Sequence, residues 1–335
     1  MKFGMLVIPS AAKGTSFPEA IAQCIEQAEI AEANGFDFCL VPEHHQSRGF
    51  IPSSLLVAAA IASRTTTLRI GTGISLIGLK HPMQVVEEFH SLDAISGGRA
   101  IAGVGMGYWE QDFTMLGLKV NQRPSRFEDA LNVLKQARTE RSINYVGRRT
   151  TVDNVKVMPP PTQPGGVPIW MGSSSDKGVE RAGKFADSLF IDQLTDTDRA
   201  VEMNDIYQKS AAEHGNKVSL ILQRHTAIAD SKMAAQEIIE PPVMRTLRSY
   251  WEKGAPDLST AWQTAKQASD IVFDDFQHRF VYGNADDCEQ SIRAWEQHMQ
   301  VDMMLPLFHT ATGPTHDVVC EQLRRFGSEV IPRFA

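Results

Sequence analysis

Short apolar runs of strand length alternate along the chain with longer stretches in which apolar residues recur at helical spacing. The run at 3–9 predicts a strand, and the pattern over 17–35 predicts a helix that ends at Asn34-Gly35, a common helix stop. Further strands are predicted at 36–42, 68–77, 99–105, 167–172, 186–192, 218–229 and 301–308. Further helices are predicted at 53–64, from Pro82 to 96–98, at 125–140, from about 174, and at 197–214, 284–299 and 314–330.

Two segments interrupt this alternation. Residues 142–166 are polar and rich in Pro and Gly, and their MPPPTQPGG run excludes a helix interior, so a surface insertion is predicted there. Residues 231–282 contain the breakers EPP and KGAPD and form the largest insertion, after the seventh strand.

Eight strand–helix units indicate parallel strands joined by helical crossovers. Their number and the length of 335 residues favour a single TIM (β/α)8 barrel domain over 1–335, with insertions. A doubly wound open sheet is the alternative, but the first strand runs into VIPSAAKG, which is not the Gly-rich GxGxxG phosphate turn of that fold.

Charge and composition exclude several classes of protein. A net charge of -7, with no basic cluster, argues against a nucleic-acid or anionic-membrane partner. The longest apolar stretch, 55–62, is far shorter than the ~20 residues that span a bilayer, and no signal peptide is recognised. The four cysteines show no CxxC pair and indicate reduced thiols in a cytoplasmic protein; they are Cys24, Cys39, Cys288 and Cys320.

In a TIM barrel the active site is built at the C-terminal ends of the strands. Residues with useful chemistry stand at these ends in the predicted fold. They are Glu43, His44 and His45 after strand 2, the stretch 105–113 after strand 4, the stretch 172–178 after strand 5, Asp192 at the end of strand 6, Arg224 and His225 on strand 7, and His309 after strand 8.

The adjacent histidines of Glu43-His44-His45 admit three interpretations: a metal site, a general acid or base, or ordinary surface residues. Successive residues of an extended chain point in opposite directions, so both rings cannot easily face one ion. No HxH or HExxH spacing lies nearby. Both observations disfavour a metal site, and the other two interpretations are favoured over it.

The Gly172-Ser173-Ser174-Ser175 stretch lies between a predicted strand and a helix start. Backbone N–H groups and hydroxyls at such a place form a cradle for phosphate, but taken alone the pattern favours a plain helix N-cap, which needs only one of the hydroxyls. The stretch 103–109 is Gly-rich but lacks GxGxxG spacing, so its glycines are better explained by close approach of a flat ligand to the backbone.

Several of these stretches together resemble the bacterial-luciferase-like flavin monooxygenases. The resemblance rests on the EHH at 43–45, the stretch 81–113 with its HP, LD, ISGGR and GVGMG elements, the VPIWMGSSS at 167–175, and the stretch 283–308. It runs in register from the first strand to the last helix.

The resemblance implies a TIM barrel that is usually dimeric and binds FMN, usually as reduced FMN from a partner reductase, or the deazaflavin F420. It implies that Gly172, Ser173, Ser174 and Ser175 hold the flavin phosphate with Arg126 as a charge partner, that a non-prolyl cis peptide joins Gly73 and Ile74 behind the flavin ring, and that His44 is the catalytic histidine supported by Glu43 and His45. The implied reaction is oxygenation of a small organic substrate by O2 through a C4a-hydroperoxyflavin, with no metal.

One departure from the luciferases concerns Gly105 and Met106, which stand where luciferase proper has a reactive Cys and an Arg. It counts against light emission and long-chain aldehyde oxidation. Met106, Tyr108 and Trp109 then predict a more apolar, aromatic pocket, to which Asp192 and His225 contribute polar groups. Residues 231–282 stand where luciferases carry a mobile loop, so a lid is predicted there.

Two alternatives remain open at this point. An F420-dependent oxidoreductase on the same fold would move a hydride and use no O2. A non-catalytic flavin-binding subunit would need no base at His44.

Overall fold

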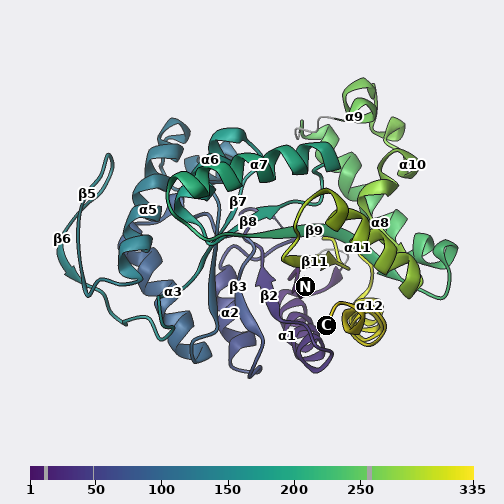
Figure 1. Ribbon diagram of the computed structural model, residues 1–335, viewed down its shortest axis with the longest axis horizontal. Helices are drawn as coiled ribbons and strands as arrows, with labels where there is room; N and C mark the ends of the chain where they lie inside the picture. Colours follow the sequence, from purple (N-terminus) through teal and green to yellow (C-terminus); the bar gives the residue numbers. More distant parts are fainter. Residues whose placement is uncertain (11–13, 48, 255–258) are drawn as a thin grey trace.

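Eight parallel strands close into a barrel in the computed structural model, which describes residues 1–10, 14–47, 49–254 and 259–335 (Figure 1). Neighbours follow the order β9-β11-β1-β2-β3-β4-β7-β8, and β8 pairs with β9 to close the ring. The predicted TIM barrel is therefore confirmed. The barrel strands are β1 Lys2–Leu6, β2 Phe38–Val41, β3 Arg69–Thr72, β4 Ala100–Val104, β7 Ile169–Gly172, β8 Ser188–Ile191, β9 Ser219–Ile228 and β11 Met303–Leu307.

The strands are buried on both faces, as parallel strands covered by helices must be. In β2, Phe38 and Leu40 point into the barrel, whereas Cys39 and Val41 pack outward against the helices. Inside the barrel the Phe38 ring meets the edge of Trp170 at a centroid distance of 5.0 Å. Each strand is therefore packed between the barrel interior and the surrounding helices, and this packing fixes the position of its C-terminal end.

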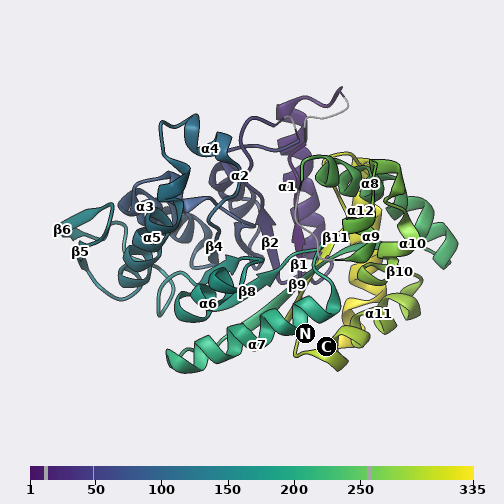
Figure 2. The same ribbon diagram turned by 90° about the horizontal axis from the view of Figure 1, so that it is seen from above.

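Helices surround the barrel, as the two views show (Figures 1 and 2). Local signals in the sequence set their ends: α1 is capped by Ser16, which accepts a hydrogen bond from the Glu19 amide, and α3 ends at Gly97 in the left-handed conformation. Apart from α8, which belongs to the insertion after β9, the longer helices are α1 Phe17–Ala33, α2 Ser54–Ala62, α3 Pro82–Ser96, α5 Arg123–Ala137, α6 Asp176–Phe185, α7 Thr197–Glu213, α11 Ala285–His298 and α12 His316–Glu329.

The 142–166 insertion contains a β-hairpin that was not predicted. β5 (Ser142–Val146) and β6 (Thr151–Lys156) pair in antiparallel fashion and project from the barrel (Figure 1). Most side chains of β6 are exposed. TVDNV at 151–155 contains three β-branched residues, which favour a strand, but they do not alternate with polar residues, so the periodic pattern of a half-buried strand is absent.

The described part of the segment 231–282 is largely helical. The helix α8 (Lys232–Glu252) continues through Pro241 and Pro242, which were expected to interrupt regular structure. After it come α9 (Thr260–Thr264), α10 (Phe273–Phe276) and β10 (Val281–Gly283), which extends the sheet beside β9; residues 255–258 of this segment lie outside the described residues.

This segment has an apolar core of its own, which explains why it folds despite the breakers. Trp251 donates from its indole to the Trp262 carbonyl at 3.1 Å and so joins α8 to α9. The cluster contains Ile239, Val243, Met244, Leu247, Trp262, Phe273, Phe276 and Tyr282. Among the described residues, no helix is long and apolar enough to cross a membrane.

Candidate functional site

A cavity of about 770 Å³ opens at the C-terminal ends of the barrel strands. Its wall includes His44 after β2, Ile74 after β3, Ser173 after β7 and Asp192 after β8, and Tyr250 of α8 adds a wall from the insertion. A smaller cavity of about 540 Å³ lies at the opposite, N-terminal end of the strands, the end of a TIM barrel that usually serves stability. The larger cavity is therefore the candidate active site.

Glu43 is a buried acid that ties three elements together. Its carboxylate accepts hydrogen bonds from the Ser75 hydroxyl at 2.7 Å, the Ser54 hydroxyl at 3.1 Å and the Leu76 amide at 3.3 Å. Burial alone would raise the pKa of Glu43, but the contacts with His45 and Ser75 outweigh burial and hold that pKa below its usual value. Glu43 therefore carries a negative charge that fixes the loop after β2.

His45 lies beside the Glu43 carboxylate and does not line the cavity. Its Nε2 is 3.4 Å from Oε1 of Glu43. The Glu43 carboxylate raises the pKa of His45, and Asp112 adds a further negative charge nearby. His45 does not line the cavity, whereas His44 does, so the two rings part as the extended backbone predicted.

His44 packs among aromatic rings at the cavity wall. Its ring lies 4.4 Å from that of Phe50 and 5.3 Å from that of Trp109, measured between centroids. Burial lowers the pKa of His44 to about 4, against a small opposing effect of the Glu43 charge. The imidazole is therefore neutral near pH 7 and holds a nitrogen lone pair that can accept a proton.

A non-prolyl cis peptide joins Gly73 and Ile74, as the resemblance implied. Both residues line the cavity. Behind them, a Cβ built on Gly105 would overlap Cδ1 of Ile74, so the absence of a side chain at 105 makes room for this isoleucine. Gly105 itself does not line the cavity, whereas Met106 does.

The Gly172–Ser175 stretch lines the cavity immediately before α6. The first amides of a helix have no partner inside the helix and point toward its N-terminus, where they favour an anion. Arg199 of α7 donates to the Ser174 carbonyl at 3.0 Å and to the Asp176 carboxylate at 2.6 Å, which holds the stretch from outside. Ser175 is the N-cap residue but makes no side-chain cap bond, so the plain N-cap explanation of this serine lacks support.

Arg123 lines the cavity, whereas Arg126, the expected charge partner, does not. Arg126 is absent from the residues that line the cavity, and its Nε donates to the Gly78 carbonyl at 2.7 Å. Arg123 lines the cavity and donates from Nη1 to the Gly107 carbonyl at 3.0 Å. The two arginines are three residues apart on α5, and sequence spacing alone does not say which of them faces the cavity.

His225 is the most buried polar group of the wall. It is 1% exposed, and neither ring nitrogen has a hydrogen-bond partner within the described part of the chain. Burial lowers the pKa of His225 to about 3, and the neighbouring Arg224 charge acts in the same direction. A buried polar group without a partner is costly, so this ring is placed to bind a ligand atom.

Asp192 and Tyr250 complete the polar part of the wall. Oδ1 of Asp192 accepts from the Leu194 amide at 2.9 Å and from the Thr195 hydroxyl at 3.0 Å. Burial raises the pKa of Tyr250, and the nearby Asp192 charge raises it further. At the rim, Tyr108 is 60% exposed, so of the predicted aromatic pair only Trp109 makes the close contact with His44.

Residues 1–320 match the model of a family described as luciferase-like monooxygenase. The chain belongs to this family. Among its relatives, the alkanal monooxygenase alpha chain of Photorhabdus luminescens is 24% identical over 83% of this chain and 77% of the relative. The uncharacterized protein y4vJ of Sinorhizobium fredii is 31% identical over 54% of this chain, and the match spans 52%, about half, of that relative.

Solved structures of luciferase-like enzymes share the fold. The oxygenating constituent of the Type II Baeyer-Villiger 3,6-diketocamphane monooxygenase of Pseudomonas putida, in complex with FMN, has a TM-score of 0.81 at 18% identity, over 99% of this chain and 98% of that chain. The coenzyme F420-dependent tetrahydromethanopterin reductase of Methanopyrus kandleri has a TM-score of 0.74 at 19% identity, over 100% of this chain and 99% of that chain.

One group of cavity residues, on α8 and at its C-terminal end, was not predicted from the sequence. Arg245, Thr246, Ser249, Tyr250 and Lys253 line the cavity. Thr246, Ser249, Tyr250 and Lys253 follow Arg245 by one, four, five and eight residues, which places all five on one helical face. The sequence contains this spacing, but the prolines of EPP led us to expect no helix here.

Proposed function

We propose that this enzyme uses reduced FMN and O2 to oxygenate a small, largely apolar organic substrate. The observation that carries the proposal is one cavity that combines a neutral His44 with the Gly172–Ser175 stretch and Arg123. Its volume of about 770 Å³ falls within the roughly 300–1,000 Å³ of pockets that enclose small molecules and cofactors.

The wall has groups that suit a flavin. The backbone amides before α6, the hydroxyls of Ser173 to Ser175 and the guanidinium of Arg123 would hold the phosphate. Ile74 offers an apolar surface to the flat ring system, and His225, with its unpartnered nitrogens, offers a hydrogen bond to a polar atom of the flavin or substrate. When bound, reduced FMN supplies the electrons that activate O2.

His44 is proposed as the base of the reaction. Its ring is neutral at physiological pH and lines the cavity, so it can take a proton from the substrate without first losing one. The Glu43 carboxylate, fixed by Ser54 and Ser75, holds the loop that carries this ring. Glu43 and His45 are thus positioning residues, and neither needs to contact the substrate.

The segment 231–282 is proposed as the lid that keeps water away from the reacting groups. α8 presents Ser249, Tyr250 and Lys253 to the cavity, and Arg245 donates to the Thr312 carbonyl across the rim at 3.1 Å. A separate flavin reductase is proposed as the source of reduced FMN, and a homodimer as the assembly; both rest on the family.

The second candidate is an F420-dependent hydride transfer, supported by the fold shared with the reductase of Methanopyrus kandleri. Oxygen uptake with reduced FMN, measured across a panel of small ketones, aldehydes, amines and aromatic compounds, separates the two. We expect substrate-dependent uptake with reduced FMN. Turnover with reduced F420 under exclusion of O2, with no response to reduced FMN, would favour the second candidate.

A further inference from the structure

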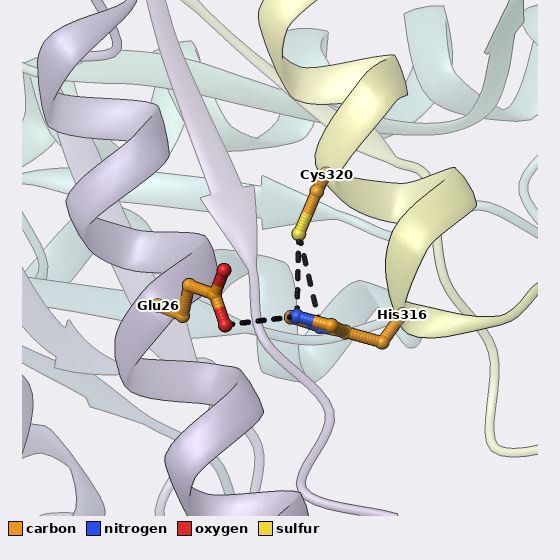
Figure 3. A group of neighbouring side chains, drawn as sticks. All are labelled: Glu26, His316 and Cys320. Carbon is orange, nitrogen blue, oxygen red and sulfur yellow. Dashed lines mark hydrogen bonds and ion pairs between the residues drawn. The ribbon is translucent and has the colours of Figure 1, made fainter.

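Three potential metal ligands meet on the outside of the barrel, away from the cavity. Glu26 of α1 faces His316 and Cys320 of α12, and their donor atoms lie within 4.8 Å of one another (Figure 3). α1 and α12 pack side by side and are the first and the last long helices of the chain. None of the three residues lines the candidate active site.

The contacts within this cluster are close to those of a metal site. Nε2 of His316 lies 3.1 Å from Oε2 of Glu26 and 3.5 Å from Sγ of Cys320. Zinc bonds of about 2.0–2.3 Å at tetrahedral angles separate ligand atoms by roughly 3.3–3.6 Å. His316 and Cys320 are four residues apart on a helix and therefore share one face of it.

The buried Gln27 is placed to orient the histidine. Its side chain is 2% exposed, its Nε2 lies 3.1 Å from Nδ1 of His316, and its Oε1 has no partner among the described residues. The oxygen and the nitrogen of a glutamine amide have nearly the same shape, so their two positions can be exchanged. When the amide is turned over, Oε1 accepts from Nδ1–H, and Nε2 of His316 is then free to bind a metal, as in histidine sites whose second nitrogen is held.

We propose that Glu26, His316 and Cys320 form a zinc site that joins α1 to α12. Thiolate, imidazole and carboxylate together match Zn²⁺ and do not match Mg²⁺ or Ca²⁺, which prefer oxygen ligands. The Glu26 side chain is 58% exposed, so solvent can complete the fourth position.

Binding requires one local movement. Sγ of Cys320 is almost equally far from the two ring nitrogens of His316, at 3.5 Å from Nε2 and 3.7 Å from Nδ1, so the sulfur does not lie along the lone pair of either. A rotation of the His316 ring turns Nε2 toward a position between Sγ and Oε2. The site is independent of the proposed oxygenation.

The test is zinc titration of the whole chain, purified with chelator, in competition with a chromophoric chelator. We expect one Zn²⁺ per chain. Loss of a residue that orients a metal ligand typically weakens metal affinity by ~10–100-fold, and Gln27→Met should weaken zinc binding by this amount. Cys320→Ser and His316→Ala remove a ligand and should each weaken zinc binding by at least as much. Cys288→Ser and His298→Ala, which alter a buried cysteine and an exposed histidine elsewhere, should bind like the wild type.

Cobalt(II) provides a direct view of the ligands. We expect a thiolate-to-cobalt charge-transfer band in the wild type that is lost in Cys320→Ser. On the wild type alone, Zn²⁺ should protect the Cys320 peptide from alkylation, which keeps the test valid if a variant fails to fold. Equal zinc affinity in wild type, Cys320→Ser and His316→Ala, or alkylation of Cys320 that zinc does not slow, would overturn the proposal.

Discussion

Two adjacent histidines do different work because they face different surroundings. His44 lies among Phe50 and Trp109, where burial keeps it neutral, whereas His45 lies beside the Glu43 carboxylate, which raises its pKa. His44 lines the cavity, whereas His45 contacts the Glu43 carboxylate and does not. At the scale of residues, burial lowers the pKa of His44, and the Glu43 charge raises the pKa of its neighbour His45.

Replacing the proposed base tests its role directly. His44→Ala should lower kcat/KM by roughly 10²- to 10⁴-fold, the usual contribution of a positioned base, while the dissociation constant for FMN changes little. Because the pKa of His44 is about 4, wild-type activity should stay level above that pH and fall as pH drops through it. Full activity in the variant would refute the assignment; exposed His298→Ala serves as the control.

The buried His225 should make stability depend on pH. Its pKa falls from 6.5 in the unfolded chain to about 3 in the folded one, so between these values the unfolded state binds the extra proton. The free energy of unfolding should therefore decline as pH falls from about 6.5 to 3. In His225→Phe this decline should be shallower, as measured by urea unfolding; identical slopes in both proteins would contradict the buried neutral ring.

Gly105 is expected to control the shape of the cavity wall. In Gly105→Ala the new methyl group overlaps Cδ1 of Ile74, and the isoleucine, being the flexible partner, should turn into the space proposed for the flavin. FMN affinity should fall while stability drops by about 1–3 kcal/mol. Adding Ile74→Val, which removes Cδ1, should restore binding; no recovery in the double variant would contradict this contact.

Sequence reasoning was most successful for residues that follow strands. His44, the Gly73-Ile74 cis peptide and the serines at 173–175 lie where strand counting and the family resemblance put them. Arg126 does not line the cavity, because the side of α5 that faces the cavity depends on the rotation of the helix about its axis, and the spacing of its arginines does not fix that rotation.

At the scale of elements, α8 joins two functions in one helix. Its buried face, with Val243, Met244 and Leu247, packs into the core of the insertion, while Ser249, Tyr250 and Lys253 face the cavity. The sequence predicted an interrupted segment because proline is costly inside a helix. Tertiary packing of this apolar face overrides that cost, and packing is not visible in a local sequence pattern.

The cavity-facing side of α8 is expected to protect the reaction from water. The triple change Ser249→Ala, Tyr250→Ala and Lys253→Ala keeps the buried Val243, Met244 and Leu247, while the Tyr250 ring, which also packs against this core, is lost. FMN binding should be preserved. Hydrogen peroxide released per reduced FMN oxidised should increase severalfold because the reacting groups become accessible to water. Met233→Ala, at a position 73% exposed on the same helix, is the matched control. An unchanged peroxide yield in the triple variant would refute the lid.

At the scale of the whole molecule, the closed barrel brings together residues that are distant in sequence. Residues between Leu6 and Thr312, from the barrel strands and the loops that follow them, meet the helix α8 at one cavity. Counting strand–helix units predicted this architecture, because parallel strands need crossovers and their C-terminal ends must share one face. Substrate identity does not follow from this, since loops and the lid shape the pocket.

The central claim is that the cavity directs oxygen from O2 into a substrate with electrons from reduced FMN. The most direct measurement is mass spectrometry of the product after reaction of the enzyme, reduced FMN and ¹⁸O₂ with a substrate identified by oxygen uptake. We expect one ¹⁸O atom per product molecule, and its loss in His44→Ala. A product without ¹⁸O, formed equally well in the absence of O2, would contradict the account.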